Sequence, residues 1–290
     1  MKQINKKFTI ATLGCRTNQY ESQAYLDQLT ALGFMQSGPD ESADLCIINT
    51  CTVTEVADKK SLATLRGLIR RNPGAKIVVT GCLAERERKR IEAIEGVSMV
   101  VPNNAKESLL SLALEIENLP EFKITQFEAH TRAFVKIQDG CNSYCSYCII
   151  PFVRGRSRSK TIPIILKEVE DLVRNGYKEV VITGINVGDF DGGDSTNGSK
   201  LSELITLLDQ IEGLHRIRIS SIDPDEVDED LLLAVVNGKK TCHSMHIVLQ
   251  SGSNSILKRM NRKYTKQDFL HTIHSCLLYT SDAADERSSV

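Results

Sequence analysis

The chain has 290 residues, of which 41% are hydrophobic and 25% charged, which suits two globular domains of ordinary size. Its 36 basic and 37 acidic residues nearly cancel, so whole-chain charge neither requires nor excludes a polyanionic partner. No apolar run reaches the length of a signal core or a membrane span, which excludes secretion and insertion and predicts a cytoplasmic protein. Because cytoplasmic thiols stay reduced, the 9 cysteines indicate metal binding or catalysis rather than disulfides.

The first hundred residues alternate short apolar runs with helical patterns. Strands are expected at 8–13, 45–49 and 75–80, and helices at 22–32 and 59–71. This βαβαβ order predicts a parallel sheet. A cysteine follows each expected strand, namely Cys15, Cys51 and Cys82. Because the carboxyl ends of parallel strands meet at one edge, these three thiols are expected to converge.

A second strand and helix series follows the helix and connector expected over 103–126. Strands are expected at 133–137, 179–183, 216–220 and 245–249, and helices at 163–175, 201–210 and 229–236. Repeated strand and helix units without reversal predict a partial (βα) barrel whose site lies at the carboxyl ends of its strands. The fold class is therefore α/β, with an amino-terminal parallel-sheet domain over 1–128 and a partial barrel over 129–275.

Three cysteines lie within eight residues directly after the first barrel strand. Cys141, Cys145 and Cys148 have CxxxCxxC spacing, which lets one loop place three thiolates around a single metal cluster. A [4Fe-4S] cluster held by three thiolates keeps one iron open to a small-molecule ligand. Zinc is the principal alternative, although structural zinc sites close with four ligands in paired spacing, and no second pair lies nearby.

This spacing after a barrel strand resembles the radical S-adenosylmethionine enzymes, and the flanking residues 138–156 look like their methylthiotransferase branch. The similarity reaches most of the chain before Ser275 and includes residues 13–15, 49–54, 80–82, 218–221 and 250–253. Within the branch, residues 49–54 and 154–159 look most like the enzymes that act on threonylcarbamoyladenosine in tRNA.

The resemblance implies two [4Fe-4S] clusters and S-adenosylmethionine as cofactors. Cys141, Cys145 and Cys148 would hold the cluster that cleaves S-adenosylmethionine to a deoxyadenosyl radical, after one electron from an unidentified donor. The amino-terminal cysteines would hold an auxiliary cluster that presents the methylated sulfur replacing hydrogen at C2 of the adenine. Other residues would contact the bound cofactor: Thr183, Gly184 and Asn186 at its methionine end, and Ser220 and Gln250 at its ribose.

Two basic clusters follow the expected site loops. The first contains Arg154, Arg156 and Arg158, and the second contains Lys258, Arg259, Arg262 and Lys263. Solvated charge is the usual role of such runs, but their position makes contact with tRNA phosphates an equal expectation. Cys46 and Cys242, within and just before apolar strands, are expected to fill core space. The chain is expected to act as a monomer.

The carboxyl-terminal segment departs from the family pattern. The resemblance calls for about two more strand and helix units and a small β-barrel domain that binds tRNA, so the chain is expected to be incomplete. Residues 276–290 back-translate to a sequencing-adapter sequence and are expected to be non-native. Two other function classes stay open. One is methylthiolation of isopentenyladenosine in tRNA or of a ribosomal-protein aspartate, and the other is a non-catalytic cluster-binding or zinc-binding module.

Overall fold

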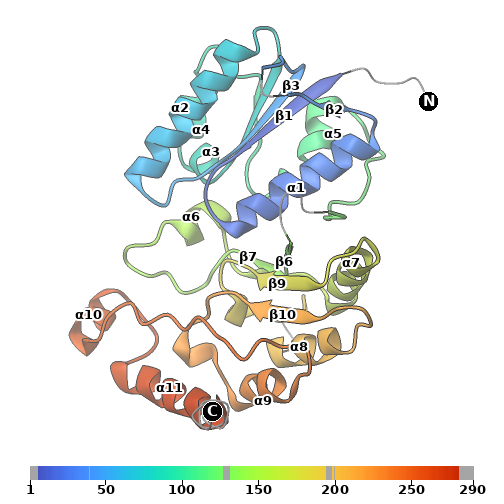
Figure 1. Ribbon diagram of the computed structural model, residues 1–290. Coiled ribbons are helices and arrows are strands. Elements are labelled where there is room, and N and C mark those ends of the chain that lie inside the picture. The colour runs from blue at the N-terminus through green and yellow to red at the C-terminus, as the bar shows by residue number, and fades with distance from the viewer. Residues whose placement is uncertain (1–5, 39, 127–130, 194–197, 199, 281–290) are drawn as a thin grey trace. The chain divides into compact units, whose positions relative to one another are not determined.

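A computed structural model describes residues 6–38, 40–126, 131–193, 198 and 200–280. The chain forms two compact units, which are described separately (Figure 1). The first comprises Met1–Gln126 together with the short segment Phe152–Gly155, and the second comprises Phe127–Pro151 and Arg156–Val290. The amino-terminal unit therefore takes a short piece of chain from the region that follows the CxxxCxxC motif. The predicted limits at 128/129 and 275/276, and the non-native tail, stay predictions, and residues 281–290 lie outside the described part.

The amino-terminal unit contains a five-stranded parallel sheet in the order β2-β1-β3-β4-β5. Its strands are β1 (Lys7–Thr12), β2 (Met35–Gln36), β3 (Leu45–Thr50), β4 (Lys76–Gly81) and β5 (Met99–Val100). The three expected strands and their parallel arrangement are confirmed. The central strand β3 is buried along its whole length, as its apolar sequence predicts for a strand covered on both faces.

Helices cover both faces of this sheet (Figure 1). They are α1 (Arg16–Ala31), α2 (Glu55–Arg71), α3 (Cys82–Arg86), α4 (Arg88–Glu92), the 3₁₀ turn η1 (Lys106–Ser108) and α5 (Leu109–Leu114). Leucines of α1 and α5 pack on one face, and those of α2 and α3 pack on the other. Helix α1 begins six residues before the expected start at 22, because its first turns bury polar side chains that hide the amphipathic pattern.

The strand register aligns the cysteine-bearing turns. Thr12 of β1 pairs with Asn49 of β3, and Thr50 of β3 pairs with Gly81 of β4. The chain leaves the three central strands at the same edge, where the next residues in each case lead to a cysteine. The expected juxtaposition of these turns is therefore confirmed at the level of the backbone.

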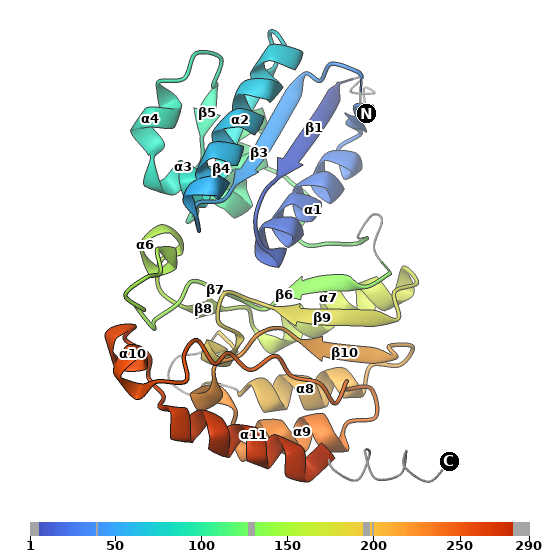
Figure 2. The ribbon, with the colours of Figure 1, turned by 60° about the vertical axis from the view of Figure 1, so that its left-hand side comes forward.

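The second unit contains a parallel sheet in the order β10-β9-β6 and a small antiparallel pair (Figure 2). Its strands are β6 (Ala133–Lys136), β7 (Gln138–Asp139), β8 (Arg158–Ser159), β9 (Glu179–Thr183) and β10 (Arg216–Ile219). Its helical elements are α7 (Ile162–Arg174), η2 (Val187–Asp189), α8 (Leu201–Asp209), η3 (Pro224–Glu226), α9 (Glu229–Asn237), α10 (Asn254–Arg259) and α11 (Lys266–Thr280). The short helix α6 (Ile150–Arg154) begins in this unit, and its residues from Phe152 onward belong to the first. The alternation of parallel strands and helices confirms the expected partial (βα) architecture.

The strand expected at 245–249 is wrong. That segment makes one isolated parallel bridge, between Ile222 and Ile247, instead of a continuous ladder. Its apolar sequence suggests a buried strand, but Met245 and Ile247 are only half-buried and Leu249 is 39% exposed. The apolar pattern therefore predicted more burial than this segment has, and no continuous strand forms.

In the part of the chain that the structure describes, no helix combines the length and apolar character needed to cross a membrane.

Candidate functional site: two cysteine sets

The CxxxCxxC motif forms a compact loop directly after β7. The Cys148 amide donates a hydrogen bond to the Cys145 carbonyl at 3.0 Å, and the Ser143 amide points at the Cys141 sulfur at 3.4 Å. Tyr144 has a positive φ of 48°, which turns the chain between the first two cysteines. Burial raises the pKa of the Cys148 thiol, and the nearby Cys145 and Cys141 raise it further. The three sulfurs therefore lie close to one another on one loop.

The end of α10 and the residues that follow it form hydrogen bonds to this loop. Ser146 donates from its amide to the Met260 carbonyl at 3.1 Å and from its hydroxyl to the Arg259 carbonyl at 2.9 Å. Asn261 donates from its side-chain amide to the Tyr144 carbonyl at 3.0 Å. These contacts cross more than one hundred residues of sequence, and spacing in the sequence gave no signal of them.

Arg262 reaches the cysteine loop itself. Its Nη1 donates to the Cys145 sulfur at 3.2 Å, and its Nη2 forms an ion pair with Asp223. Its side chain is 6% exposed. Burial alone would lower the pKa of Arg262, but the facing carboxylate of Asp223 outweighs it and raises that pKa. The prediction that Arg262 contacts tRNA phosphates is corrected, because this guanidinium is enclosed and already engaged.

Three thiols with this arrangement fit an iron-sulfur cluster. The sulfurs come from one loop, and a buried guanidinium donates to one of them. The Arg262 Nε, which is also buried, finds no hydrogen-bond acceptor in the described part of the chain. A buried donor without an acceptor is costly, and the sulfur atoms of a bound cluster would provide one. The donor set and this orphaned donor both fit a cluster bound by the loop.

The polar residues predicted to bind S-adenosylmethionine lie at the carboxyl ends of β9 and β10. The Ser220 hydroxyl donates to the Thr183 hydroxyl at 3.2 Å, so these adjacent strand ends are joined. Gln138 Oε1 accepts from the Asn186 amide at 2.9 Å and from the Ile185 amide at 3.0 Å. Sequence reasoning missed Gln138, although its position just before the cysteine loop was a possible signal.

Gly184 and Gln250 differ in their surroundings. A Cβ at Gly184 would lie 2.9 Å from Gln138 Oε1, so a glycine permits the close approach of the two loops. Gln250 is exposed and has a positive φ of 58°. Among the described residues it makes no hydrogen bond to the group around Thr183. The structure therefore brings Thr183, Gly184, Asn186 and Ser220 together, and within the described part of the chain no hydrogen bond joins Gln250 to them.

Glu226 is a second residue that sequence reasoning missed. Its Oε1 accepts from the Asn186 side-chain amide at 2.6 Å, and its side chain lies so close to Gly188 that a Cβ there would clash. Burial raises the pKa of Glu226 to about 7, the bond from Asn186 opposes this, and the charges of Asp223 and Asp189 add to it. A carboxyl group that is half protonated near neutral pH therefore faces Asn186.

Replacing Glu226 with glutamine is expected to remove a pH dependence of stability. The pKa of about 7 in the folded chain exceeds the ordinary value of 4.5, so the protonated form is favoured by folding. This stabilisation is complete below pH 4.5 and is lost as the pH rises through 7. From pH 5 to 8, the free energy of unfolding of Glu226→Gln should rise relative to wild type by about 2–3 kcal/mol. Urea titrations at both pH values measure this, and parallel curves would contradict it.

The three amino-terminal cysteines lie at the shared edge of their sheet. A Cβ at Gly14 would lie 2.9 Å from the Cys51 sulfur, which places the turn that carries Cys15 against Cys51. Burial raises the pKa of the Cys82 thiol, Arg154 lowers it, and Cys15 raises it. Cys51 and Cys82 are buried, whereas Cys15 is exposed. The turns from three strands thus bring these thiols into one neighbourhood, and three thiols with a nearby cation fit an anionic cluster.

A charged network lies beside Cys82 within the amino-terminal unit. Glu21 Oε1 accepts from both Lys106 Nζ and Arg154 Nη1, the latter at 3.1 Å. Its Oε2 accepts from Asn49 at 3.1 Å. One carboxylate therefore accepts from two cations, and both cations lower the pKa of the Cys82 thiol beside them. The prediction that Arg154 contacts tRNA phosphates is corrected, because its side chain is 0% exposed and bonded to Glu21.

Gly81 is required where β4 turns into Cys82. Its φ is +95°, and a Cβ would lie 2.4 Å from the Thr50 carbonyl oxygen and 2.5 Å from the Thr50 nitrogen. Gly81→Ala is therefore expected to destabilise the unit by about 2–5 kcal/mol, which combines left-handed strain with overpacking. Gly74→Ala, at φ +83° with open space around it, is the matched control and isolates the strain. Urea denaturation followed by circular dichroism measures both, and equal losses would contradict the steric argument.

The remaining predicted basic residues are exposed. They are Arg156, Arg158, Lys258, Arg259 and Lys263. Arg158 also pairs with Asp139 at 3.1 Å, while its side chain stays 47% exposed. Their contact with tRNA stays a prediction. Cys46 is fully buried in the core, and burial raises its pKa to about 11, in agreement with its expected packing role.

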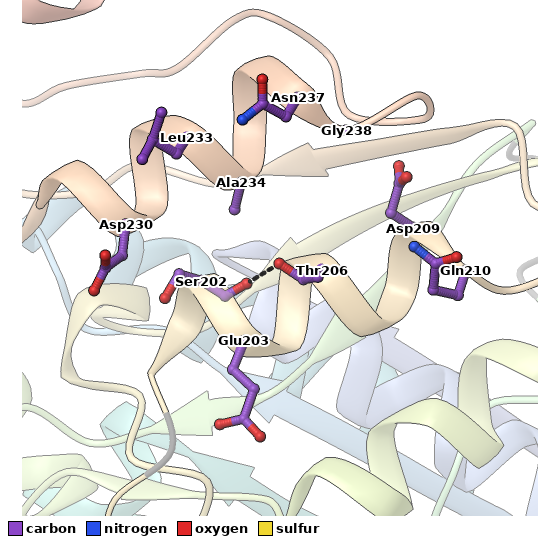
Figure 3. Close-up of a pocket in the computed structure, with 10 residues that line it drawn as sticks. All are labelled: Ser202, Glu203, Thr206, Asp209, Gln210, Asp230, Leu233, Ala234, Asn237 and Gly238. Atoms are coloured by element: carbon purple, nitrogen blue, oxygen red, sulfur yellow. Dashed lines mark hydrogen bonds between the residues drawn. The ribbon is translucent and has the colours of Figure 1, made fainter.

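An open groove of about 470 Å³ lies between α8 and α9 of the second unit, and none of the residues that line it is a cysteine (Figure 3). Two of the acidic residues that line it have partners. Asp209 accepts from the backbone amides of Lys239 and Lys240, and Asp230 accepts from Lys200. Thr206 donates to the Ser202 carbonyl at 2.9 Å, which is a bond within α8. Asp209 and Asp230 therefore serve to hold neighbouring segments in place.

No three histidine, cysteine, aspartate or glutamate side chains in the described ranges converge closely enough to hold one metal ion. A structural zinc ion needs four ligands about a single point, at roughly 2.0–2.3 Å. Thiolates that bind separate irons of one cluster are further apart than ligands of a single ion. Both cysteine sets offer three thiols, one fewer than the four ligands that close a structural zinc site.

Comparison with known proteins agrees with this geometry. Residues 135–279 match the radical SAM superfamily, and residues 7–102 match the family described as "Uncharacterized protein family UPF0004". The chain is 51% identical over 273 residues to threonylcarbamoyladenosine tRNA methylthiotransferase MtaB of Chlamydia pneumoniae, covering 93% of this chain and 64% of that protein. It is 35% identical over 286 residues to tRNA-2-methylthio-N(6)-dimethylallyladenosine synthase of Clostridium novyi, covering 92% and 63%.

The chain belongs to the methylthiotransferase branch of the radical SAM superfamily. It spans less than two thirds of the length of the two relatives named above. Among solved structures, it resembles the radical S-adenosylmethionine methyltransferase TsrM of Kitasatospora setae, with a TM-score of 0.65, 13% identity and coverage of 94% and 65%. This last likeness concerns the fold alone.

Proposed function

We propose that the protein transfers a methylthio group to C2 of N6-threonylcarbamoyladenosine, next to the anticodon of tRNA. The observation that carries this proposal is the pairing of two separate three-cysteine sets in one chain. One set lies on a single loop of the radical SAM unit, and the other is assembled from three strand ends of the amino-terminal sheet. Identity of 51% to an enzyme of that name supports the choice of substrate.

The cofactors in this proposal are two [4Fe-4S] clusters and S-adenosylmethionine. Bound there, the clusters would supply reductive cleavage of S-adenosylmethionine and a place for the transferred sulfur. Cys141, Cys145 and Cys148 would hold one cluster and leave one iron open. A one-electron donor is then required, and the proposed tRNA substrate would place the reaction in the cytoplasm. Action as a monomer stays a prediction.

The protein's own polar groups would orient S-adenosylmethionine. The Thr183 and Ser220 hydroxyls face one another at the strand ends, where they would bond its polar groups. The Asn186 side chain donates to Glu226 and so has a fixed direction. Gln138 fixes the backbone of this turn by accepting from two successive amides. A preformed set of donors and acceptors lowers the entropic cost of positioning a reactive cofactor.

The amino-terminal set would present sulfur for transfer. Its three thiols leave one iron of a four-iron cluster without a protein ligand. The positive charges of Arg154 and Lys106, which lower the pKa of the Cys82 thiol, would stabilise the thiolate form that a cluster requires. The exposed basic residues of the second unit would hold tRNA phosphates, a contribution that should weaken as salt concentration rises.

Mass spectrometry of nucleosides tests the proposal. tRNA from a strain that lacks the gene should lose 2-methylthio-N6-threonylcarbamoyladenosine and accumulate its unmodified precursor, and the gene on a plasmid should restore it. Loss of the isopentenyladenosine derivative instead would assign the activity named for the Clostridium novyi relative. Unchanged tRNA nucleosides with iron-loaded protein would exclude both tRNA activities.

A further inference from the structure

Arg262 occupies a position between the cysteine loop and the partly buried carboxylate of Asp223. Its Nη1 donates to the Cys145 sulfur at 3.2 Å, while Nη2 pairs with Asp223. We propose that Arg262 is a positioning residue for the cluster of the radical SAM unit, donating hydrogen bonds to its sulfur atoms and raising its reduction potential. This inference rests on the proposed function, because it presumes a cluster on that loop.

The guanidinium is held in one orientation. Its central carbon, Arg262 Cζ, lies 4.8 Å from the centre of the Tyr264 ring, so the ring covers one face of the planar guanidinium. The Tyr264 hydroxyl donates to the Val248 carbonyl at 2.7 Å and the Leu249 carbonyl at 3.0 Å, which fixes the ring. Asp223 pairs with Nη2 of the guanidinium, and this contact directs Nη1 at the Cys145 sulfur. The arrangement is preformed, so little entropy is lost when it acts.

One donor of this group is still available. Arg262 Nε is buried and has no acceptor within the described part of the chain. Leaving a buried donor unsatisfied costs about 1–3 kcal/mol, and more when the group is charged. A sulfur atom of a cluster bound by Cys145 and its neighbours would be the missing acceptor. The buried fork thus provides one bond to a ligand thiolate and a second donor for the cluster.

Such bonds act on the two redox states unequally. A reduced cluster carries one more negative charge than the oxidised one, and charge-assisted hydrogen bonds strengthen with the charge of the acceptor. Donors to cluster sulfurs therefore favour the reduced state and raise the potential. Electron transfer to the cluster would become easier, which is the step that S-adenosylmethionine cleavage requires.

Three variants and one control test the inference. Arg262→Gln removes the charge and the fork, Arg262→Lys keeps the charge without the fork, and Asp223→Asn releases the anchor while keeping arginine. Lys263→Gln makes the same charge change as Arg262→Gln at an exposed neighbour. The 290-residue chain is reconstituted with iron and sulfide without oxygen and titrated with reductant. The signal of this cluster is identified by its loss from Cys141→Ala/Cys145→Ala/Cys148→Ala.

At the wild-type midpoint, the ratio of reduced to oxidised cluster should fall about tenfold in Arg262→Gln, equal to 59 mV for one electron. Arg262→Lys and Asp223→Asn should shift the same way by less, and Lys263→Gln should match wild type. If Arg262→Gln does not fold, the reduction potentials of Arg262→Lys and Asp223→Asn decide whether the inference holds. Wild-type potentials in the folded Arg262 variants would overturn the inference while leaving the proposed function intact.

Hydrogen exchange of the cluster-free chain gives a second readout. The Ser146 amide donates to Met260, so the loop opens more often if Arg262 no longer holds Cys145. Exchange at that amide should therefore be faster in Arg262→Gln than in Lys263→Gln. Equal exchange rates in the two variants would contradict the proposal that Arg262 holds Cys145 in place. A wild-type chain that binds no cluster on this loop would instead refute the proposed function, and the inference with it.

Discussion

Replacing Cys141, Cys145 and Cys148 together with alanine is expected to abolish reductive cleavage of S-adenosylmethionine. These thiols lie on one loop, and their removal leaves the second unit no cysteine set to hold a cluster. The amino-terminal set lies on a different unit, where it would hold the second proposed cluster. Iron and sulfide in the reconstituted protein should therefore fall by about half, since each cluster holds four irons. Deoxyadenosine formation with dithionite as reductant measures the activity, and iron and sulfide assays measure the loading.

Cys242→Ala is the matched control for this experiment. Cys242 lies in the same unit and is partly buried, but belongs to neither cysteine set. It should retain full iron content and deoxyadenosine formation. Complete loss of iron from a correctly folded triple variant would contradict two independent sites. Persistent deoxyadenosine formation from that variant would instead show that the loop holds no radical-generating cluster.

The sequence predicted the framework of both units because their strands are short, apolar and regularly separated by helices. β9, for example, was expected at 179–183 and is found at Glu179–Thr183. Strand order then placed Cys15, Cys51 and Cys82 at one edge without knowledge of any side-chain contact. The sequence was least reliable where an apolar segment is not buried, as at 245–249, because strand pairing there is limited to one isolated bridge.

The contacts that organise the site could not be read from sequence because they join distant segments. Arg262 lies 117 residues from Cys145, and Arg154 lies 133 residues from Glu21. Both arginines appear in basic runs whose other members are exposed, so composition grouped them with a polyanion-binding surface. The structure separates them from the exposed members because each of these two guanidinium groups is itself buried and pairs with a carboxylate. Burial of a specific partner, which depends on tertiary packing, decides the role of these charges.

Replacing Cys15, Cys51 and Cys82 with alanine should have the converse effect. Deoxyadenosine formation should persist, since the cysteine loop of the second unit needs only its own three thiols. The methylthio product in tRNA should vanish when the variant gene replaces the natural one in its host, because no iron would remain to present sulfur. Mass spectrometry of tRNA nucleosides measures this loss.

The control for that variant must separate loss of a ligand from damage to the sheet. Cys46→Ala deletes a fully buried thiol from β3, the same strand that leads to Cys51, but away from the cysteine edge. It should lower the free energy of unfolding by about 1–3 kcal/mol through the cavity it leaves, yet keep its iron and its product. Robust product from the triple variant would show that the three cysteines have a structural role. Loss of product from Cys46→Ala at full stability would show that the edge alone does not determine sulfur transfer.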